Sequence, residues 1–263
     1  MEKYLLRGYV TPEDMQGTDA QRIQAALDLA RQLDINKVVL DGVYVADRSV
    51  TLPAGIHLVI NGKLRIPAFV TQRPENYSFT QQWFHLEGEG WLEGDVELFN
   101  CDHVKINSLL IRGEVKLTYC RNVRMERITI PEGGLRIGKG CSNLILQDMF
   151  IHGQDTAVLV DAGMGEGIVP GIDPTVQNVA VRRSGLLTQA PAVVLRAAEK
   201  AGLLNIQVDW ITAEHVGVVV GVPEAALPAE HYQNITLERI VTETPVKIHA
   251  EVLHLYTNKL GEG

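Results

Sequence analysis

Short apolar segments recur from about residue 96 onward in three series that repeat together every ~20 to 35 residues. The first series comprises Val96–Leu98, Val115–Leu117, Leu135–Ile137, Ala157–Val160, Ala192–Leu195, Gly217–Val220 and Val246–Ile248. Members of the second series begin with Asn or His: His103–Ile106, Asn122–Met125, Asn143–Leu146, Asn178–Val181, Asn205–Val208 and Asn234–Leu237. The third series includes Leu109–Ile111, Ile128–Ile130 and Met149–Ile151. Three strands per repeat are typical of one coil of a solenoid.

One such coil cannot bury its apolar face, whereas stacked coils bury a continuous core along a common axis. The repeat therefore predicts an all-β chain folded as a right-handed, single-stranded parallel β-helix. Neighbouring coils should lie about 4.8 Å apart, which is the usual spacing between strands. We expect functional residues on the outside of the stack, where the polar residues of successive coils line up.

The N-terminal segment has the pattern of a cap on the solenoid. Thr18 followed by Gln21 forms a capping box, and apolar residues from Ile23 to Leu33 recur at helical spacing. These features predict a helix over 19–33 that covers the open end of the first coil. We expect the cap over about 17–35, coils over about 36–256 and one domain over 1–263, with the polar residues 67–82 forming an excursion beside the helix.

Composition and charge narrow the class of protein. The 263 residues are 46% hydrophobic and 21% charged, with a net charge of −8. A negative chain is not expected to bind nucleic acid or anionic membranes, and no apolar run is long enough to cross a bilayer. The first residues lack the apolar core of a secretion signal, which favours a cytoplasmic location unless such a signal has been removed.

The three cysteines follow the repeat. Cys101, Cys120 and Cys141 are separated by 19 and 21 residues, so each should occupy the same place in successive coils. A zinc site of the common kind needs two close pairs, and a disulfide framework usually needs an even number of cysteines. The spacing predicts a buried stack of reduced thiols.

The opening stretch Gly17–Asp28, followed by Val38–Leu40, Gly42–Tyr44 and Leu52–Gly55, resembles the start of proteins in the pectin-lyase-like superfamily, especially the polygalacturonase-type glycoside hydrolases. The likeness extends over nearly the whole chain, because the later coils have that family's rhythm. The resemblance implies a parallel β-helix with a groove along one face that acts on acidic polysaccharides.

The catalytic motif of that family is only partly present. Polygalacturonases have a Gly-Asp-Asp-Cys segment, and here Gly153–Leu159 places Gln154 at the first acidic position and Asp155 at the second. Gln cannot deliver a proton, so the resemblance implies Asp155 as the catalytic carboxylate. Glu132, one coil earlier, is its expected partner, because hydrolysis with inversion needs two separated carboxyl groups. The family's Gly-His-Gly motif has no counterpart, and its Arg-Ile-Lys motif retains one cation, Arg196, which is expected to bind acidic groups of the substrate.

Outward residues of the first strand series form a second constellation. Glu97, Lys116 and Arg136 are the middle residues of their strands and should stack in adjacent coils. They could hold a sugar, with Lys116 and Arg136 binding uronate carboxylates, or they could form a solvated face of balanced charges. The outward residues of the later coils, Leu159, Val194 and Val219, are apolar, which would require a partner subunit or a covering loop.

Further candidates lie near the predicted groove. The Gly- and Pro-rich segment Asp161–Pro174 lengthens one coil and predicts a loop at the groove edge. We expect Asp161 in that loop, together with His152 and Gln154, to contact substrate. Asp161, Glu166 and Asp173 fit no calcium-loop motif, and no motif for a metal or cofactor is present, so none is expected.

These features lead to a hydrolase acting on uronate-containing oligo- or polysaccharides as the main hypothesis. Two alternatives stay open. One is a non-catalytic carbohydrate-binding or structural protein, adhesin-like or a subunit of a homo-oligomer. The other is a lyase or epimerase on the same scaffold that uses Lys116 or Arg136 as its base.

Overall fold

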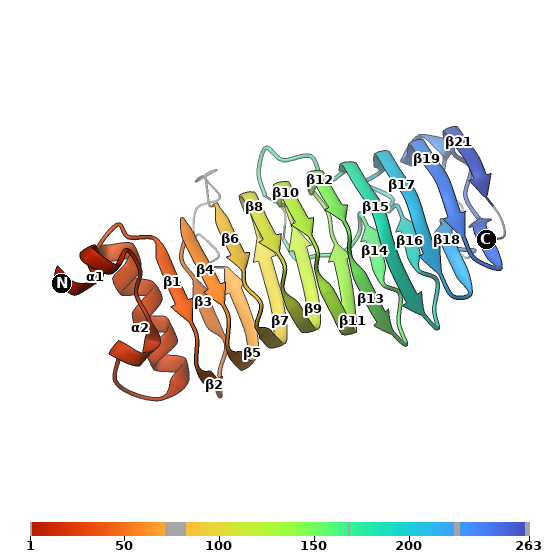
Figure 1. Cartoon of the computed structure of the whole chain (residues 1–263). Coiled ribbons are helices and arrows are strands. Elements are labelled where there is room, and N and C mark those ends of the chain that lie inside the picture. Colours follow the sequence, from red (N-terminus) through yellow and green to blue (C-terminus); the bar gives the residue numbers. More distant parts are fainter. Residues whose placement is uncertain (1, 72–82, 168, 224–226, 261–263) are drawn as a thin grey trace.

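The computed structural model describes residues 2–71, 83–167, 169–223 and 227–260 (Figure 1). Its strands stack along one axis, with helices α1 (Glu2–Arg7) and α2 (Asp19–Gln32) at the N-terminal end and the last strand at the other. Short 3-10 turns lie at Pro12–Asp14 and Ala229–His231. The predicted right-handed parallel β-helix with a capping helix is confirmed.

Every strand pairing in the described residues is parallel and joins one coil to the next. The strands are β1 Lys37–Leu40, β2 Val43–Val45, β3 Val50–Leu52, β4 Ile56–Ile60, β5 Lys63–Thr71, β6 Phe84–Glu87, β7 Trp91–Phe99, β8 Asp102–Asn107, β9 Leu110–Thr118, β10 Arg121–Glu126, β11 Thr129–Ile137, β12 Ser142–Gln147, β13 Phe150–Gly153, β14 Val158–Asp161, β15 Val176–Thr188, β16 Val193–Arg196, β17 Leu203–Ala213, β18 Val216–Val220, β19 Tyr232–Val241, β20 Thr244–Ile248 and β21 Leu253–Leu260.

Each coil contributes to three faces. The first face contains β1, β4, β6, β8, β10 and β12 and the first parts of β15, β17 and β19. The second face contains β13, the beginnings of β7, β9 and β11, and the ends of β15, β17 and β19. The third face contains the ends of β7, β9 and β11, followed by β14, β16, β18 and β20. Side chains alternate along each strand, so one set fills the core and the other faces outward.

Asparagines form a ladder where the first-face strands begin. Asn122, Asn143, Asn178, Asn205 and Asn234 all have φ between 52° and 58°, a left-handed conformation that Asn tolerates better than most residues. The amide of Asn143 donates to Asn122, that of Asn178 to Asn143, that of Asn205 to Asn178 and that of Asn234 to Asn205, at 2.9 to 3.2 Å. The Asn that opens each repeat of the sequence therefore sets the backbone of a turn and bonds the coils together.

The predicted cysteine stack and helix cap are confirmed. Cys101, Cys120 and Cys141 are free and buried, and the backbone N–H of Cys120 donates to Cys141 Sγ at 3.4 Å. Burial raises the pKa of the Cys101 and Cys141 thiols. Thr18 and Gln21 form both bonds of the capping box, and Ile23, Leu27 and Ala30 of α2 are buried against the first coil.

The predicted excursion over 67–82 is wrong in its first part. Residues 67–71 continue strand β5, because Phe69 fits the core as the partner of Val50 below it and Val96 above it. Residues 72–82 lie outside the described residues. No described helix is long and apolar enough to span a membrane.

Candidate functional site

The predicted stack of charged side chains is present on the third face. Glu97 in β7 is the register partner of Lys116 in β9, and Lys116 is the partner of Arg136 in β11. These residues point outward because their neighbours Val96, Val115 and Leu135 are fully buried. The two-residue period of a strand thus places one charged side chain above another in three consecutive coils.

Three carboxylates surround Lys116. Its Nζ lies 3.1 Å from Asp95 Oδ2, 3.2 Å from Glu114 Oε2 and 3.3 Å from Glu97 Oε1. Burial alone would lower the pKa of Lys116, but the hydrogen bonds and charges of these carboxylates outweigh that effect and raise it above its usual value. The lysine is therefore a cation fixed by the protein's own acids.

Arg136 extends the cluster towards the next coil. Its Nε donates to Glu114 Oε1 at 3.1 Å and its Nη1 donates to the carbonyl oxygen of Thr156 at 2.6 Å. The side chain is only 11% exposed. The cluster contains two cations and three carboxylates, so it carries one excess negative charge. From the sequence, Lys116 and Arg136 were expected to bind a sugar carboxylate, but this excess charge makes the surface less suited to one.

Asp95 and Glu114 were not among the residues predicted from the sequence. Each follows a glycine, Gly94 or Gly113, at the corner between the second and third faces. These glycines have φ of 148° and 155°, and a Cβ on Gly94 would lie 1.8 Å from the carbonyl oxygen of Ile66. A Gly followed by an acid at the same corner of two successive coils is the signal that would have found them.

The predicted Gly- and Pro-rich loop is present between β14 and β15, although Asp161, its predicted first residue, is the last residue of β14. The chain between β14 and β15 turns back along the earlier coils, where Gly165 lies so close to Thr118 that a Cβ would meet its Cγ2 at 2.6 Å. The backbone N–H of Lys139 donates to the carbonyl oxygen of Met164, and that of Gly140 to Pro174. Val169 packs in a small apolar cluster with Phe99 and Tyr119. The loop is thereby fixed against β7, β9 and β11.

A cleft lies between this loop and the charged stack. It has a volume of about 540 Å³, which is within the range of small-ligand sites. Its apolar lining comes from Val70, Leu98, Phe99 and Met164, and its polar lining includes Thr71, Glu97, Lys116, Thr118 and Glu166. Glu97 is 44% exposed, so its carboxylate remains available to a ligand. The cleft joins an apolar wall to hydrogen-bonding groups, which is the arrangement that small polar ligands use.

The two predicted catalytic carboxylates occupy one corner of adjacent coils. Glu132 and Asp155 both lie between the rung that pairs Ile130 with Ile151 and the rung that pairs Leu135 with Val158. Both side chains are exposed, and neither makes a hydrogen bond or ion pair with another described residue. They are accessible, but they lie outside the residues that line the cleft.

The other predicted contact residues are dispersed. His152 and Gln154 are exposed near the same corner as Asp155. Asp161 is buried at the end of β14 and lies 3.3 Å from Arg196 of the next coil, so these two residues form an ion pair outside the cleft. The outward apolar residues of the later coils do not form a fully exposed strip, because Val194 is buried and Leu159 and Val219 are half-buried.

The second face has an exposed aromatic ring that could stack against a ligand. Trp91 is 44% exposed beside the outward residues Val43 and Val45. Lys63 Nζ lies 5.0 Å and Arg112 Cζ 5.6 Å from its ring centre. These cations already occupy the π-system, which leaves the cleft as the better ligand site.

Known structures with a similar fold were found, although no similar sequence family was. No protein-family model matches this chain, and no curated protein matches it. Among solved structures, a mutant tailspike protein of E. coli bacteriophage HK620 has a TM-score of 0.60 at 13% identity, over 98% of this chain and 58% of that chain. Another mutant of the same tailspike, in complex with a pentasaccharide, has a TM-score of 0.56 at 14% identity with the same coverage. The catalytic domain of a GH87 alpha-1,3-glucanase in complex with nigerose has a TM-score of 0.49 at 10% identity, over 95% of this chain and 57% of that chain. This chain thus spans less than two thirds of each of these proteins, and the similarity to the two tailspike structures, at 13 to 14% identity, shows the fold alone.

Proposed function

We propose that this protein binds an oligosaccharide in the cleft between the charged stack and the loop 162–175. The observation that carries the proposal is the cleft itself, where the half-exposed carboxylate of Glu97 lies beside the apolar side chains of Phe99 and Met164. A sugar ring has an apolar face and a rim of hydroxyl groups, and ionised carboxylates are strong acceptors for hydroxyl donors. A pentasaccharide complex of a tailspike with the same fold is in keeping with this use of the scaffold.

Neutral sugars fit this cleft better than uronates. Lys116 is already paired with Asp95, Glu97 and Glu114, and the cluster has an excess negative charge. A uronate carboxylate would add a like charge at this position and would have to displace one of the protein's own acids. We therefore infer recognition through hydroxyl groups.

The test is to screen the purified protein against immobilised neutral and uronate-containing oligosaccharides, with circular dichroism to verify folding. The proposal expects saturable binding to neutral oligosaccharides. Binding to uronates alone would contradict the recognition mode, and a well-folded protein that retains no oligosaccharide at all would contradict the function.

Hydrolysis is the second candidate, and the shared corner of Glu132 and Asp155 favours it. Residues one coil apart are separated by about 4.8 Å along the axis, and long acidic side chains can widen that separation towards the 6.5 to 9.5 Å typical of inverting glycosidases. New reducing ends released from a bound oligosaccharide, and lost in Asp155→Asn, would establish this activity. Release that persists unchanged in Asp155→Asn would remove Asp155 as the catalytic carboxylate.

A further inference from the structure

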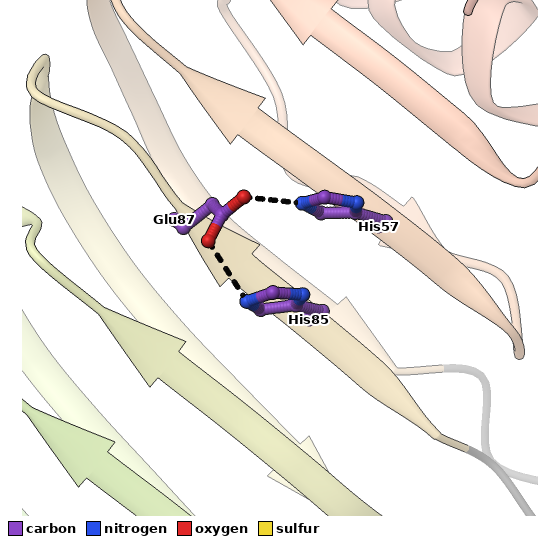
Figure 2. Close-up of side chains that lie close together, drawn as sticks. All are labelled: His57, His85 and Glu87. Carbon is purple, nitrogen blue, oxygen red and sulfur yellow. Dashed lines mark hydrogen bonds and ion pairs between the residues drawn. The ribbon is translucent and has the colours of Figure 1, made fainter. Parts of the chain in front are cut away.

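Two histidines and a glutamate converge on the first face, near the N-terminal end of the solenoid. His57 in β4 and His85 in β6 are register partners in adjacent coils, and Glu87 lies two residues after His85 on the same side of its strand (Figure 2). The two imidazole rings stack with their centres 4.3 Å apart and an angle of 9° between their planes. The candidate oligosaccharide site is on a different face and contains none of these residues.

The ligand atoms of the three side chains point towards one another. The Nε2–H of His57 donates to Glu87 Oε1 at 2.8 Å, and His85 Nε2 lies 3.1 Å from Glu87 Oε2. These atoms all lie within 4.8 Å of one another. In a tetrahedral zinc site with bonds near 2.1 Å, neighbouring ligand atoms are about 3.4 Å apart. A bound ion therefore requires changes of about 1.5 Å or less in the separations of these atoms, which already face a common point.

The Nε2 atom of His85 is buried, and among the described residues it finds no acceptor or donor with hydrogen-bond geometry, although Glu87 Oε2 lies 3.1 Å away. This nitrogen faces His57 and the Glu87 carboxylate, so an ion bound between the three side chains would give it a partner.

The backbone holds this arrangement in place. Ile56 and Leu58 on either side of His57, and Phe84 and Leu86 on either side of His85, are 0 to 1% exposed. Parallel hydrogen bonding between β4 and β6 keeps the histidines in register. The ligand side chains are 22 to 31% exposed, although His85 Nε2 itself is buried.

We propose that His57, His85 and Glu87 form a site for a divalent transition-metal ion, with Zn²⁺ as the ion that fits it best. Two imidazoles and one carboxylate suit Zn²⁺, whereas Ca²⁺ and Mg²⁺ prefer sites made of oxygen atoms. Three protein ligands leave the fourth tetrahedral position for water. The ion would join β4 to β6, two strands whose ligands are 28 residues apart along the chain.

The positive charges around this site oppose a cation and limit its affinity. Lys37 is the register partner of His57 on one side, and Lys105 is the partner of His85 on the other. Lys105 is exposed, so water screens much of its effect. We therefore expect the site to bind zinc reversibly.

The test uses tag-free, EDTA-treated full-length protein titrated with Zn²⁺ against a chromophoric chelator, and with Co²⁺ followed by visible absorption. The proposal expects one equivalent of Zn²⁺ and the d–d bands of tetrahedral Co²⁺. His57→Gln, His85→Gln and Glu87→Gln should each weaken binding by at least about tenfold, because even supporting residues of metal sites contribute that much. His249→Gln, which replaces an exposed histidine beyond β20, is the matched control and should bind like the parent protein.

The outcomes separate the proposal from its alternatives. Glu87→Gln keeps the size and shape of the side chain, so it gives an answer even if a histidine variant folds poorly. An absence of saturable binding, or equal binding by Glu87→Gln and the parent, would overturn the proposal. A thiolate-to-cobalt charge-transfer band would place the ion on the buried cysteines and would overturn it as well.

Discussion

The ammonium group of Lys116 lies 3.3 Å from the carboxylate of Glu97, its register partner in the preceding coil. Asp95 and Glu114 contact the same nitrogen, so one lysine holds three acids on adjacent coils together. We predict that Lys116→Met lowers the free energy of unfolding by about 1 to 2 kcal/mol, because exposed ion pairs contribute up to about 1 kcal/mol each and the acids would then repel. Urea denaturation measures this difference. Lys247→Met, at an exposed position of the same outward ladder in β20, should change stability by less than about 0.5 kcal/mol.

The same cluster predicts a dependence on alkaline pH. The pKa of Lys116 is raised in the folded protein, so its contribution to stability is fully present below the usual lysine pKa of 10.5 and is lost as the pH rises through the folded value. The stability difference between the parent and Lys116→Met should stay constant between about pH 7 and 10 and shrink above that range. A difference that shrinks on the acidic side of this range while staying constant above it would contradict the assignment.

The asparagine ladder predicts that two substitutions of the same residue differ in stability. Asn178 has φ of 55°, donates to Asn143 and accepts from Asn205. Asn178→Gly removes both bonds but tolerates the left-handed backbone, whereas Asn178→Ala loses the bonds and strains the backbone as well. We expect Asn178→Ala to be less stable than Asn178→Gly by about 1 kcal/mol in thermal or urea unfolding. Equal stability of the two variants would show that backbone conformation is not what selects Asn here.

Most of the fold could be predicted from the sequence because its determinants are periodic. The Asn or His at the start of each second-series segment marks a left-handed turn, and the 19- and 21-residue cysteine spacing gives the length of a coil. Residues 67–71 were missed because Pro67 and the polar residues after Thr71 resemble a loop, although Phe69 faces the core. The polarity of neighbouring residues therefore predicts strand boundaries less well than the register between coils does.

The candidate sites were harder to predict because they depend on neighbours far apart in the chain. The stacking of Glu97, Lys116 and Arg136 follows from strand periodicity alone, and it was predicted correctly. The pairing of His57 with His85 depends on the length of the intervening segment, which departs from the regular period. The repeated pattern of apolar residue, His, Leu at residues 56–58 and 84–86 was the available signal.

Lys105 provides a test of the electrostatics of the proposed zinc site. It occupies the rung beside His85, and removing its charge should favour a bound cation. We predict that Lys105→Gln raises the affinity for Zn²⁺ roughly sevenfold, since a unit charge and a doubly charged ion about 7 Å apart in water repel by roughly 1.2 kcal/mol. The chelator competition assay measures the change. An affinity that falls in Lys105→Gln would place the ion elsewhere.

Titration calorimetry of the parent protein and Glu97→Gln, with a neutral oligosaccharide selected in the screen, tests the proposed function most directly. Glu97→Gln removes the negative charge of the exposed acceptor in the cleft and replaces one of its oxygens by a donor, and it leaves Lys116 paired with Asp95 and Glu114. Glu126→Gln is the matched control, because Glu126 lies in β10 outside the cleft and is likewise held in an ion pair, with Arg124. The account predicts that Glu97→Gln weakens binding about tenfold, because hydrogen bonds to a charged group are stronger than those to a neutral amide, and that Glu126→Gln binds like the parent. Unchanged affinity in Glu97→Gln, or an equal loss in both variants, would contradict the assignment of this cleft as the oligosaccharide site.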